Sequence, residues 1–301
     1  MLMVNEKPLV IGIGELLWDI FPGGKKMGGA PANVIYHAVQ SGCNGHVISS
    51  VGADNLGDLM VDEMAGRGLS ADYITRDEDH PTGTVTVTLD NNGSPSYVIH
   101  ENVAWDNIRE TEENSMLVEK ADAVCFGSLA QRSNVTGSTI TSLLGKAGKN
   151  TLKVFDLNLR QKFYSYEVIE RSLELSNVLK LNNDELEIIA GIFSLDGTDH
   201  ERLEQLSVKY DIELIALTKG SDSSIIFTLT EQSTLPSPRV NVVDTVGAGD
   251  CFTAVLIAGM LNNNSLREIH ERAVDLSAWV CTQHGATPGY NIDPEKFKIF
   301  K

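Results

Sequence analysis

A short glycine-rich segment is the strongest sign of chemistry in this sequence. It reads DTVGAGD over residues 244–250 and is followed by the apolar run Cys251–Met260. Two glycines around one alanine allow a tight turn with outward-pointing N–H groups, and a following helix adds its positive end. The segment therefore predicts a pocket for concentrated negative charge. Asp250 is expected in the first helical turn, a position that favours the ionised carboxylate.

Two interpretations of Asp250 remain open on this chemistry. A carboxylate beside such a pocket can take a proton from an alcohol while the pocket holds a transferring phosphoryl group. The same residues also describe an ordinary helix start, in which Asp250 only complements the helix dipole.

The elements that must position these residues are strands alternating with helices. Short β-branched or apolar runs predict strands at Pro8–Gly12, His46–Val51, Ala123–Gly127, Lys153–Asp156, Val178–Leu181 and Leu214–Thr218. Amphipathic patterns predict helices at Ala32–Gly42, Leu56–Arg67, Thr139–Gly148, Ser165–Asn177, Glu201–Tyr210, Ala248–Leu261 and Leu266–Gln283. This alternation indicates an α/β fold with a mainly parallel sheet that helices cover on both faces.

One segment departs from that alternation. Thr82–Leu89 alternates threonine with mainly valine or leucine, which is typical of a strand with one polar and one apolar face. Residues 91–94 (NNGS) favour a turn, and Ser96–His100 can return as a partner strand. An isolated hairpin is marginal in water. We therefore expect a lid over a site or a contact with another subunit, with an edge hairpin of the main sheet as the alternative.

Composition limits the possible partners. The chain has 301 residues and a formal net charge of -17, which disfavours binding to nucleic acid or to an anionic membrane. Its four cysteines form no CxxC pair, and no signal peptide or bilayer-spanning apolar run is visible. We expect a single cytoplasmic domain.

Two motifs together carry a family resemblance. Residues 244–250 resemble the C-terminal signature of the ribokinase-like (pfkB) carbohydrate kinases, and residues 28–33 (GGAPAN) resemble their other signature. The resemblance runs from about Gly12 to Pro288. It implies a three-layer α/β/α fold with a mostly parallel central sheet and a small β-sheet lid. The single domain would span 1–301, with the lid built from segments around 14–30 and 82–102.

The resemblance also implies roles for the phosphate end of a site. Asp250 would be the general base, and the amides of Gly247, Ala248 and Gly249 would form the anion hole. ATP would contact Thr218, Gly220, Gly247, Gly249 and Gly285. Asn182 and Glu185 match the family's N-x-x-E motif, which organises Mg²⁺ through its waters; without the resemblance this segment would suggest a capped helix start. Some family members also need a monovalent cation such as K⁺.

At the sugar end, the resemblance implies contacts to hydroxyl groups. The matching positions are Asp19, Gly28, Gly29 and Asn33. We also expect Arg160, near the end of the strand Lys153–Asp156, to pair with ATP phosphates.

Weaker motifs suggest the substrate. Trp18-Asp19, the GGAPAN segment and Glu101–Asp106 are most similar to bacterial fructokinases, which implies conversion of fructose to fructose 6-phosphate. A kinase for ribose or 2-keto-3-deoxygluconate is one alternative, and a non-catalytic sugar-binding protein on this fold is another. A dehydrogenase is disfavoured, because the Gly12-Ile13-Gly14 segment lacks the third glycine of a dinucleotide motif. The apolar hairpin face (Val85, Val87 and Leu89) suggests a homodimer through the lid.

Overall fold

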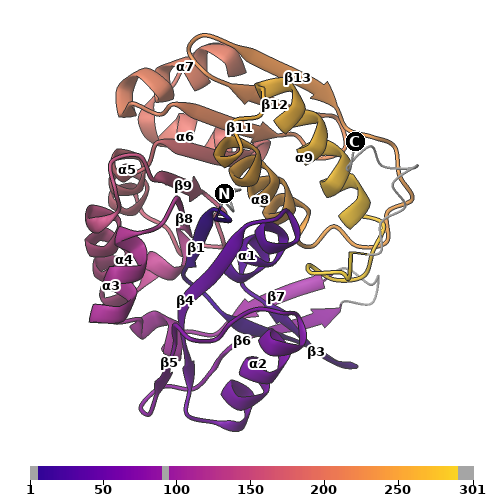
Figure 1. Ribbon diagram of the computed structural model, residues 1–301. Helices are drawn as coiled ribbons and strands as arrows, with labels where there is room; N and C mark the ends of the chain where they lie inside the picture. Colours follow the sequence, from indigo (N-terminus) through magenta and orange to yellow (C-terminus); the bar gives the residue numbers. More distant parts are fainter. Residues whose placement is uncertain (1–5, 90–94, 291–301) are drawn as a thin grey trace, which may run out of the picture.

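The computed structural model describes residues 6–89 and 95–290, and within them a nine-stranded sheet lies between two layers of helices (Figure 1). In spatial order its strands are β13 (Gln232–Pro236), β12 (Ser223–Phe227), β11 (Leu214–Thr218), β10 (Val178–Asn182), β9 (Leu152–Asp156), β8 (Ala123–Gly127), β1 (Leu9–Ile13), β4 (Asn44–Gly52) and β5 (Ile74–Asp77). From β11 to β5 in this order, neighbouring strands run parallel. The strand β12 pairs antiparallel with β11, and β13 pairs antiparallel with β12.

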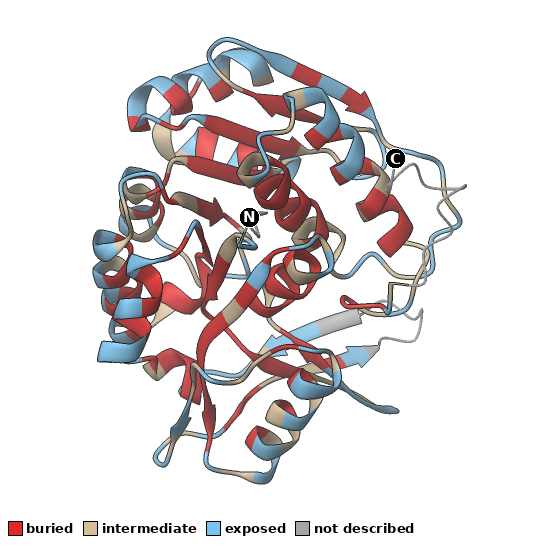
Figure 2. Cartoon of the chain, viewed as in Figure 1, coloured by how far each residue is buried: buried red, intermediate tan, exposed pale blue. Residues whose placement is uncertain are grey.

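Helices cover both faces of this sheet, each over its own apolar core. One layer holds α1 (Ala30–Gln40), α2 (Asn55–Gly66), α8 (Ala248–Leu261) and α9 (Leu266–Val280). The other holds α3 (Glu112–Glu119), α4 (Asn134–Lys146), α5 (Tyr166–Leu175), α6 (Asn183–Phe193) and α7 (Asp199–Tyr210). Strand side chains alternate between the two cores: Val10 packs into the first, and Ile11 and Ile13 pack into the second. Figure 2 shows the resulting buried strands and the buried inner faces of the helices.

The three-layer fold expected from the sequence is confirmed. The predicted parallel strands occur within one or two residues of their expected bounds, and α8 has the expected bounds. The strand β5, the hairpin β12–β13 and the helix α3 were not expected, whereas α6 begins at the capped helix start that Asn182 and Glu185 suggest without the resemblance. No helix in the described ranges combines the length and apolar character needed to span a bilayer.

A separate small sheet lies beside the main one. Its order is β3 (Gly24–Gly28), β2 (Leu17–Phe21), β6 (Gly83–Leu89) and β7 (Pro95–Ile99). The expected hairpin is present as β6 and β7, which are antiparallel and pair Val85 with Ile99. It joins β2 and not an edge of the main sheet, so the edge-hairpin alternative is wrong. The predicted turn at 91–94 lies outside the described residues.

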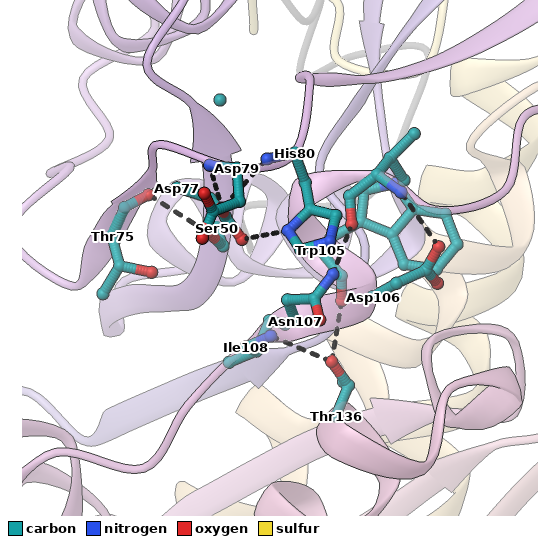
Figure 3. A network of polar contacts seen from close by, with 12 residues as sticks. Ser50, Thr75, Asp77, Asp79, His80, Trp105, Asp106, Asn107, Ile108 and Thr136 are labelled. Carbon is teal, nitrogen blue, oxygen red and sulfur yellow. Dashed lines mark hydrogen bonds and ion pairs between the residues drawn. The ribbon is translucent and has the colours of Figure 1, made fainter.

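Two polar clusters anchor the start of β6. Thr82 donates from its amide and its hydroxyl to the carboxylate of Asp54, at 2.8 and 2.7 Å. Trp105 belongs to the 3-10 helix η1 (Ala104–Asn107), and its indole packs against Gly83. A Cβ at Gly83 would be 2.2 Å from the indole Nε1. Thr136 of α4 holds η1 by donating to the Trp105 carbonyl at 2.9 Å (Figure 3). The segment around Trp105 therefore supports the small sheet.

The guanidinium of Arg132 reinforces this support. It lies in a second 3-10 helix, η2 (Leu129–Arg132), 3.9 Å from the centre of the Trp105 ring, and it donates to both carboxylate oxygens of Asp106 at 2.8 and 2.9 Å. A buried, bidentate ion pair stacked on an indole is a rigid arrangement. The root of the small sheet is therefore fixed to the main domain.

Candidate active site

The glycine segment forms the tight turn that was expected, at the start of α8. Gly247 caps the helix in the left-handed conformation, with φ +82°, and a Cβ there would lie 2.5 Å from the carbonyl oxygen of Ala286. Within the described residues, the amides of Gly247 and Gly249 have no hydrogen-bond partner, whereas the Ala248 amide donates to Thr245 at 3.3 Å. Two free N–H groups at a helix N-terminus suit an anionic ligand.

Asp250 lies in the first turn of that helix, partly buried, and it is linked to the GGAPAN segment. The side-chain amide of Asn33 on α1 donates to Oδ2 of Asp250 at 2.8 Å. Burial, followed by repulsion from Asp156, raises the pKa of Asp250 to about 6. Burial and Asp156 therefore act against the ionised form that the helix start alone was expected to favour. A carboxyl with this pKa is suited to proton transfer near neutral pH.

The expected sugar residues meet at the junction of the small sheet and the main domain. The carboxylate of Asp19 on β2 lies against Gly28 of β3, where a Cβ would be 2.6 Å from its Oδ2. Gly29 has φ +118°, and a Cβ there would lie 2.2 Å from the carbonyl oxygen of Glu15. Both glycines are therefore needed for close packing. Burial raises the pKa of Asp19 to about 6, against the attraction of Arg160 and Lys26.

Glu15 is a candidate site residue that was not predicted from the sequence. It follows β1, is almost completely buried, and accepts a bond at 3.2 Å from the Ala30 amide. Its Oε2 and the Oδ1 of Asn33 are both buried without a partner in the described part of the chain. Burial raises the pKa of Glu15 to about 7. Two unsatisfied polar atoms in one place point to a polar ligand.

A cavity of about 600 Å³ opens on the other side of the glycine turn. Thr218 and Gly220, after β11, line it together with Ala248 and Gly249. Much of its remaining wall is apolar, with Phe252, Val274 and Ala278 among the lining residues. The cavity therefore joins an apolar chamber to the free amides of the turn, an arrangement that suits a flat ring with an anionic tail.

The two other residues expected at the nucleotide, Gly247 and Gly285, are not among those that line this cavity. Gly247 contacts Ala286, as described above. Gly285 has φ +79°, and its amide donates to Oδ2 of Asp244 at 3.0 Å, which ties the C-terminal segment to the glycine turn. Lys219 is directed away from the cavity, because it pairs with Asp199 at the start of α7.

Comparison with known proteins identifies the family. The profile of the pfkB family of carbohydrate kinases matches residues 17–292. The chain belongs to the pfkB family. Its relatives include an uncharacterized sugar kinase of Pyrococcus horikoshii, 30% identical over 275 residues, which are 86% of this chain and 84% of the relative. A fructokinase of Escherichia coli is 27% identical over 293 residues, covering 91% and 93%.

The solved structures agree on the fold. A fructokinase of Xylella fastidiosa with bound ATP superposes with a TM-score of 0.82 at 22% identity, covering 93% of this chain and 94% of that one. The Pyrococcus horikoshii sugar kinase in complex with ATP gives 0.79 at 29% identity, covering 92% and 94%. This pfkB chain is thus a carbohydrate kinase of ribokinase-like fold, in a family whose structures include ATP complexes.

The pfkB N-x-x-E motif forms a helix cap in this chain. Oδ1 of Asn182 accepts the Glu185 amide at 2.9 Å, and Oε2 of Glu185 accepts the Asn182 amide at 2.8 Å. The other carboxylate oxygen accepts the Leu159 amide at 2.9 Å. Each of these oxygens retains a lone pair, so the pair fits a metal-bound water better than a direct metal ligand. The described residues contain no cluster of three or more His, Cys, Asp or Glu arranged for a metal ion.

Arg160 lies on the sugar side of the site. It is exposed, and its charge lowers the pKa values of Glu15, Asp19 and Asp250, although burial remains the largest influence on each. The guanidinium is therefore close to the acidic groups at the base of the small sheet. The sequence analysis assigned it to ATP phosphates; the structure associates it with these acids.

Proposed function

We propose that this carbohydrate kinase transfers the γ-phosphate of ATP to a hydroxyl of fructose, giving fructose 6-phosphate. The observation that carries the proposal is the position of Asp250. It lies between the buried polar cluster of Glu15 and Asn33, which has unsatisfied oxygens, and the glycine turn, whose Gly249 lines the large cavity. A sugar hydroxyl and a terminal phosphate can meet only where both regions adjoin.

Each region has a distinct role in the proposed reaction. The sugar is held by Asp19 and Asn33 at the glycine segment 28–29, since carboxylate and amide groups each bond two hydroxyls. The adenine occupies the cavity beside Thr218 and Gly220. Asp250 accepts the hydroxyl proton as the oxygen attacks phosphorus, and the amides of the turn at 247–249 stabilise the developing charge.

Mg²⁺ belongs to this proposal through the water-mediated fit of Asn182 and Glu185. When bound with ATP, the ion would neutralise phosphate charge. For K⁺, the turn offers the carboxylate of Asp244, whose oxygens already accept the amides of Val246 and Gly285. No step is assigned to K⁺, and rates in KCl and NaCl test the requirement.

The small sheet is proposed as the lid over the sugar. Its closure would exclude water and limit wasteful hydrolysis of ATP. The expected dimer contact through Val85 and Val87 loses its basis, because both side chains are buried within a single chain. A lid-mediated homodimer would instead use the exposed Tyr97 and Val98 of the edge strand β7. Sedimentation at micromolar concentration tests this, and a monomer contradicts it.

The choice of fructose rests on resemblance and relatives. The Trp18-Asp19 pair and the GGAPAN segment resemble bacterial fructokinases, and the Escherichia coli relative carries that name. Ribose and 2-keto-3-deoxygluconate kinases are the alternatives within the family, and a non-catalytic sugar-binding protein is the alternative outside it. The four free cysteines fit a reducing cytoplasm.

A sugar panel tests the proposal. The purified protein is incubated with Mg-ATP and with fructose, ribose or 2-keto-3-deoxygluconate, and ADP release is measured. We expect the highest kcat/KM with fructose. A higher value with another sugar contradicts the substrate, and no ADP above the sugar-free control with any sugar favours the binding protein.

A further inference from the structure

Lys180 is a buried cation next to the glycine turn at residues 247–249. It lies in the middle of β10 and is only 7% exposed. Its Nζ is so close to Gly249 that a Cβ added there would be 3.0 Å away. Within the described residues, its ammonium donates one bond, to Oδ1 of Asp156 at 3.1 Å. An ammonium group has three N–H donors, so two of them are not used in a hydrogen bond to the described residues.

Asp156 connects this lysine to the first turn of α8. The two residues are direct neighbours across the parallel strands β9 and β10. Oδ2 of Asp156 accepts the hydroxyl of Thr253 at 2.8 Å, and the same hydroxyl lies 3.1 Å from the carbonyl oxygen of Gly249. The chain of contacts therefore runs from the sheet, through a buried ion pair, to the turn that carries the free amides.

A buried ion pair is a poor device for stability alone. Removing two charges from water costs several kcal/mol per ion, and well-packed apolar residues of similar size are often as stable or more stable. Lys180 interrupts a strand whose neighbours Leu179 and Leu181 are fully buried and apolar. The cation at this position therefore calls for a functional explanation.

The charges around the turn supply that explanation. Asp156 from β9, Asp250 from α8 and Glu185 from α6 all interact electrostatically with Lys180. A chain of net charge -17 must accept a polyanionic nucleotide beside these carboxylates. A fixed positive charge in a poorly hydrated site offsets this repulsion far better than a solvated one.

We propose that Lys180 is a positioning residue for phosphoryl transfer: it holds the Gly249 turn through Asp156 and Thr253 and places a positive charge behind the anion-binding amides. This inference rests on the proposed kinase function. Because this charge lies behind the amides that would hold the terminal phosphate, its loss should weaken discrimination between nucleoside triphosphate and diphosphate.

The test compares Lys180→Met, Asp156→Asn and the double variant with the wild type. In Lys180→Met, we expect kcat to fall about 10- to 100-fold, a smaller loss than the ~10²–10³-fold found when a direct donor is removed. The sugar KM should change less than about threefold, since the sugar contacts lie on the other side of Asp250. The double variant lacks both charges of the Lys180–Asp156 pair, so its Tm should recover much of the loss seen in each single variant while its kcat stays low.

A binding measurement separates this inference from the proposed function. The affinities for AMP-PNP and ADP are measured by calorimetry with Mg²⁺ and without sugar. In the wild type we expect tighter binding of AMP-PNP than of ADP, and we expect this preference to disappear in Lys180→Met and in the double variant; a wild type without it contradicts the proposal. This readout needs no turnover, so it decides the role of Lys180 even if every sugar in the panel is inactive.

Lys146→Met serves as the matched control. Lys146 pairs with Glu110 and is the last residue of α4. The chain then enters β9 at Leu152, so Lys146 lies near the N-terminal ends of the parallel strands, away from the glycine turn. It should retain kcat and nucleotide preference. The proposal is overturned if the double variant regains both kcat and Tm, or if Lys180→Met keeps the wild-type preference for AMP-PNP.

Discussion

Asn33 donates a 2.8 Å hydrogen bond from Nδ2 to Oδ2 of Asp250, although 217 positions separate the two residues in the chain. The bond joins the two pfkB signatures, since Asn33 ends the GGAPAN segment and Asp250 ends the glycine turn. It fixes the rotamer of the proposed base and lowers its pKa, in opposition to burial and to Asp156. The amide therefore orients the proposed base, in addition to the sugar contact proposed for it.

Loss of this amide should weaken the base. In Asn33→Ala, Asp250 loses a bond that favours its ionised form, so its pKa should rise above about 6. We expect kcat to fall about tenfold or more and the acid limb of its pH profile to move to higher pH. Gln40→Ala, at an exposed position at the other end of α1, is the control. An unchanged acid limb would show that Asn33 does not set the base.

The wild-type rate should itself fall in mild acid. Asp250 has a raised pKa of about 6, and only its ionised form accepts a proton. The groups that act on it are Asp156, which raises this pKa, and Asn33, Lys180 and Arg160, which lower it. At saturating Mg-ATP, kcat/KM for the sugar, which reports the enzyme without bound sugar, should be constant above about pH 7 and fall about tenfold or more per pH unit well below 6. A flat profile down to pH 5 would contradict the assignment.

Glu15 should make the unliganded protein less stable as the pH rises. Its pKa is raised from 4.5 to about 7, so the folded state binds the proton more tightly than the unfolded chain. Stability from this group is present below pH 4.5 and is lost as the pH rises through about 7, by on the order of 3 kcal/mol. In Glu15→Gln, denaturant unfolding should show a smaller loss between these pH values. An equal loss in both proteins would mean that Glu15 is ionised in the fold.

Gly247 should tolerate no side chain. Its φ of +82° is strained for alanine, and the added Cβ would lie 2.5 Å from the Ala286 carbonyl oxygen. In Gly247→Ala we expect a displaced anion hole and a loss of kcat of about 10²-fold or more. Gly191→Ala is the matched control, because a Cβ in that part of α6 meets nothing within 4 Å. It should keep kcat, with equal or slightly greater stability. Equal activity of the two variants would exclude the turn from the chemistry.

The features predicted well from the sequence are those with local causes. The buried parallel strands are short apolar runs between helices, and α8 follows a glycine turn with a long apolar stretch, so their bounds were readable. The hairpin was visible in the alternation of Thr82–Leu89. Its attachment to β2 was not, because pairing between segments some 60 residues apart has no local signature.

The features that were missed depend on burial and distant charges. The pKa of Asp250 is raised by desolvation and by Asp156, which precedes it by almost one hundred residues, and neither influence is visible in the local sequence of the helix start. The local sequence around Glu15 is that of an ordinary loop, and only the fold shows that its Oε2 is buried without a partner among the described residues. Lys180 had one readable signal, a lysine between two leucines in an apolar strand, and it was passed over.

The most direct test of the account is the kcat of Asp250→Asn at saturating fructose and Mg-ATP. The asparagine keeps the shape of the side chain but cannot accept the proton, so kcat should fall about 10²–10⁴-fold. Calorimetry should find fructose and AMP-PNP affinities within about threefold of the wild type, with mass spectrometry excluding deamidation back to aspartate. A kcat near that of the wild type in such a preparation would contradict Asp250 as the base.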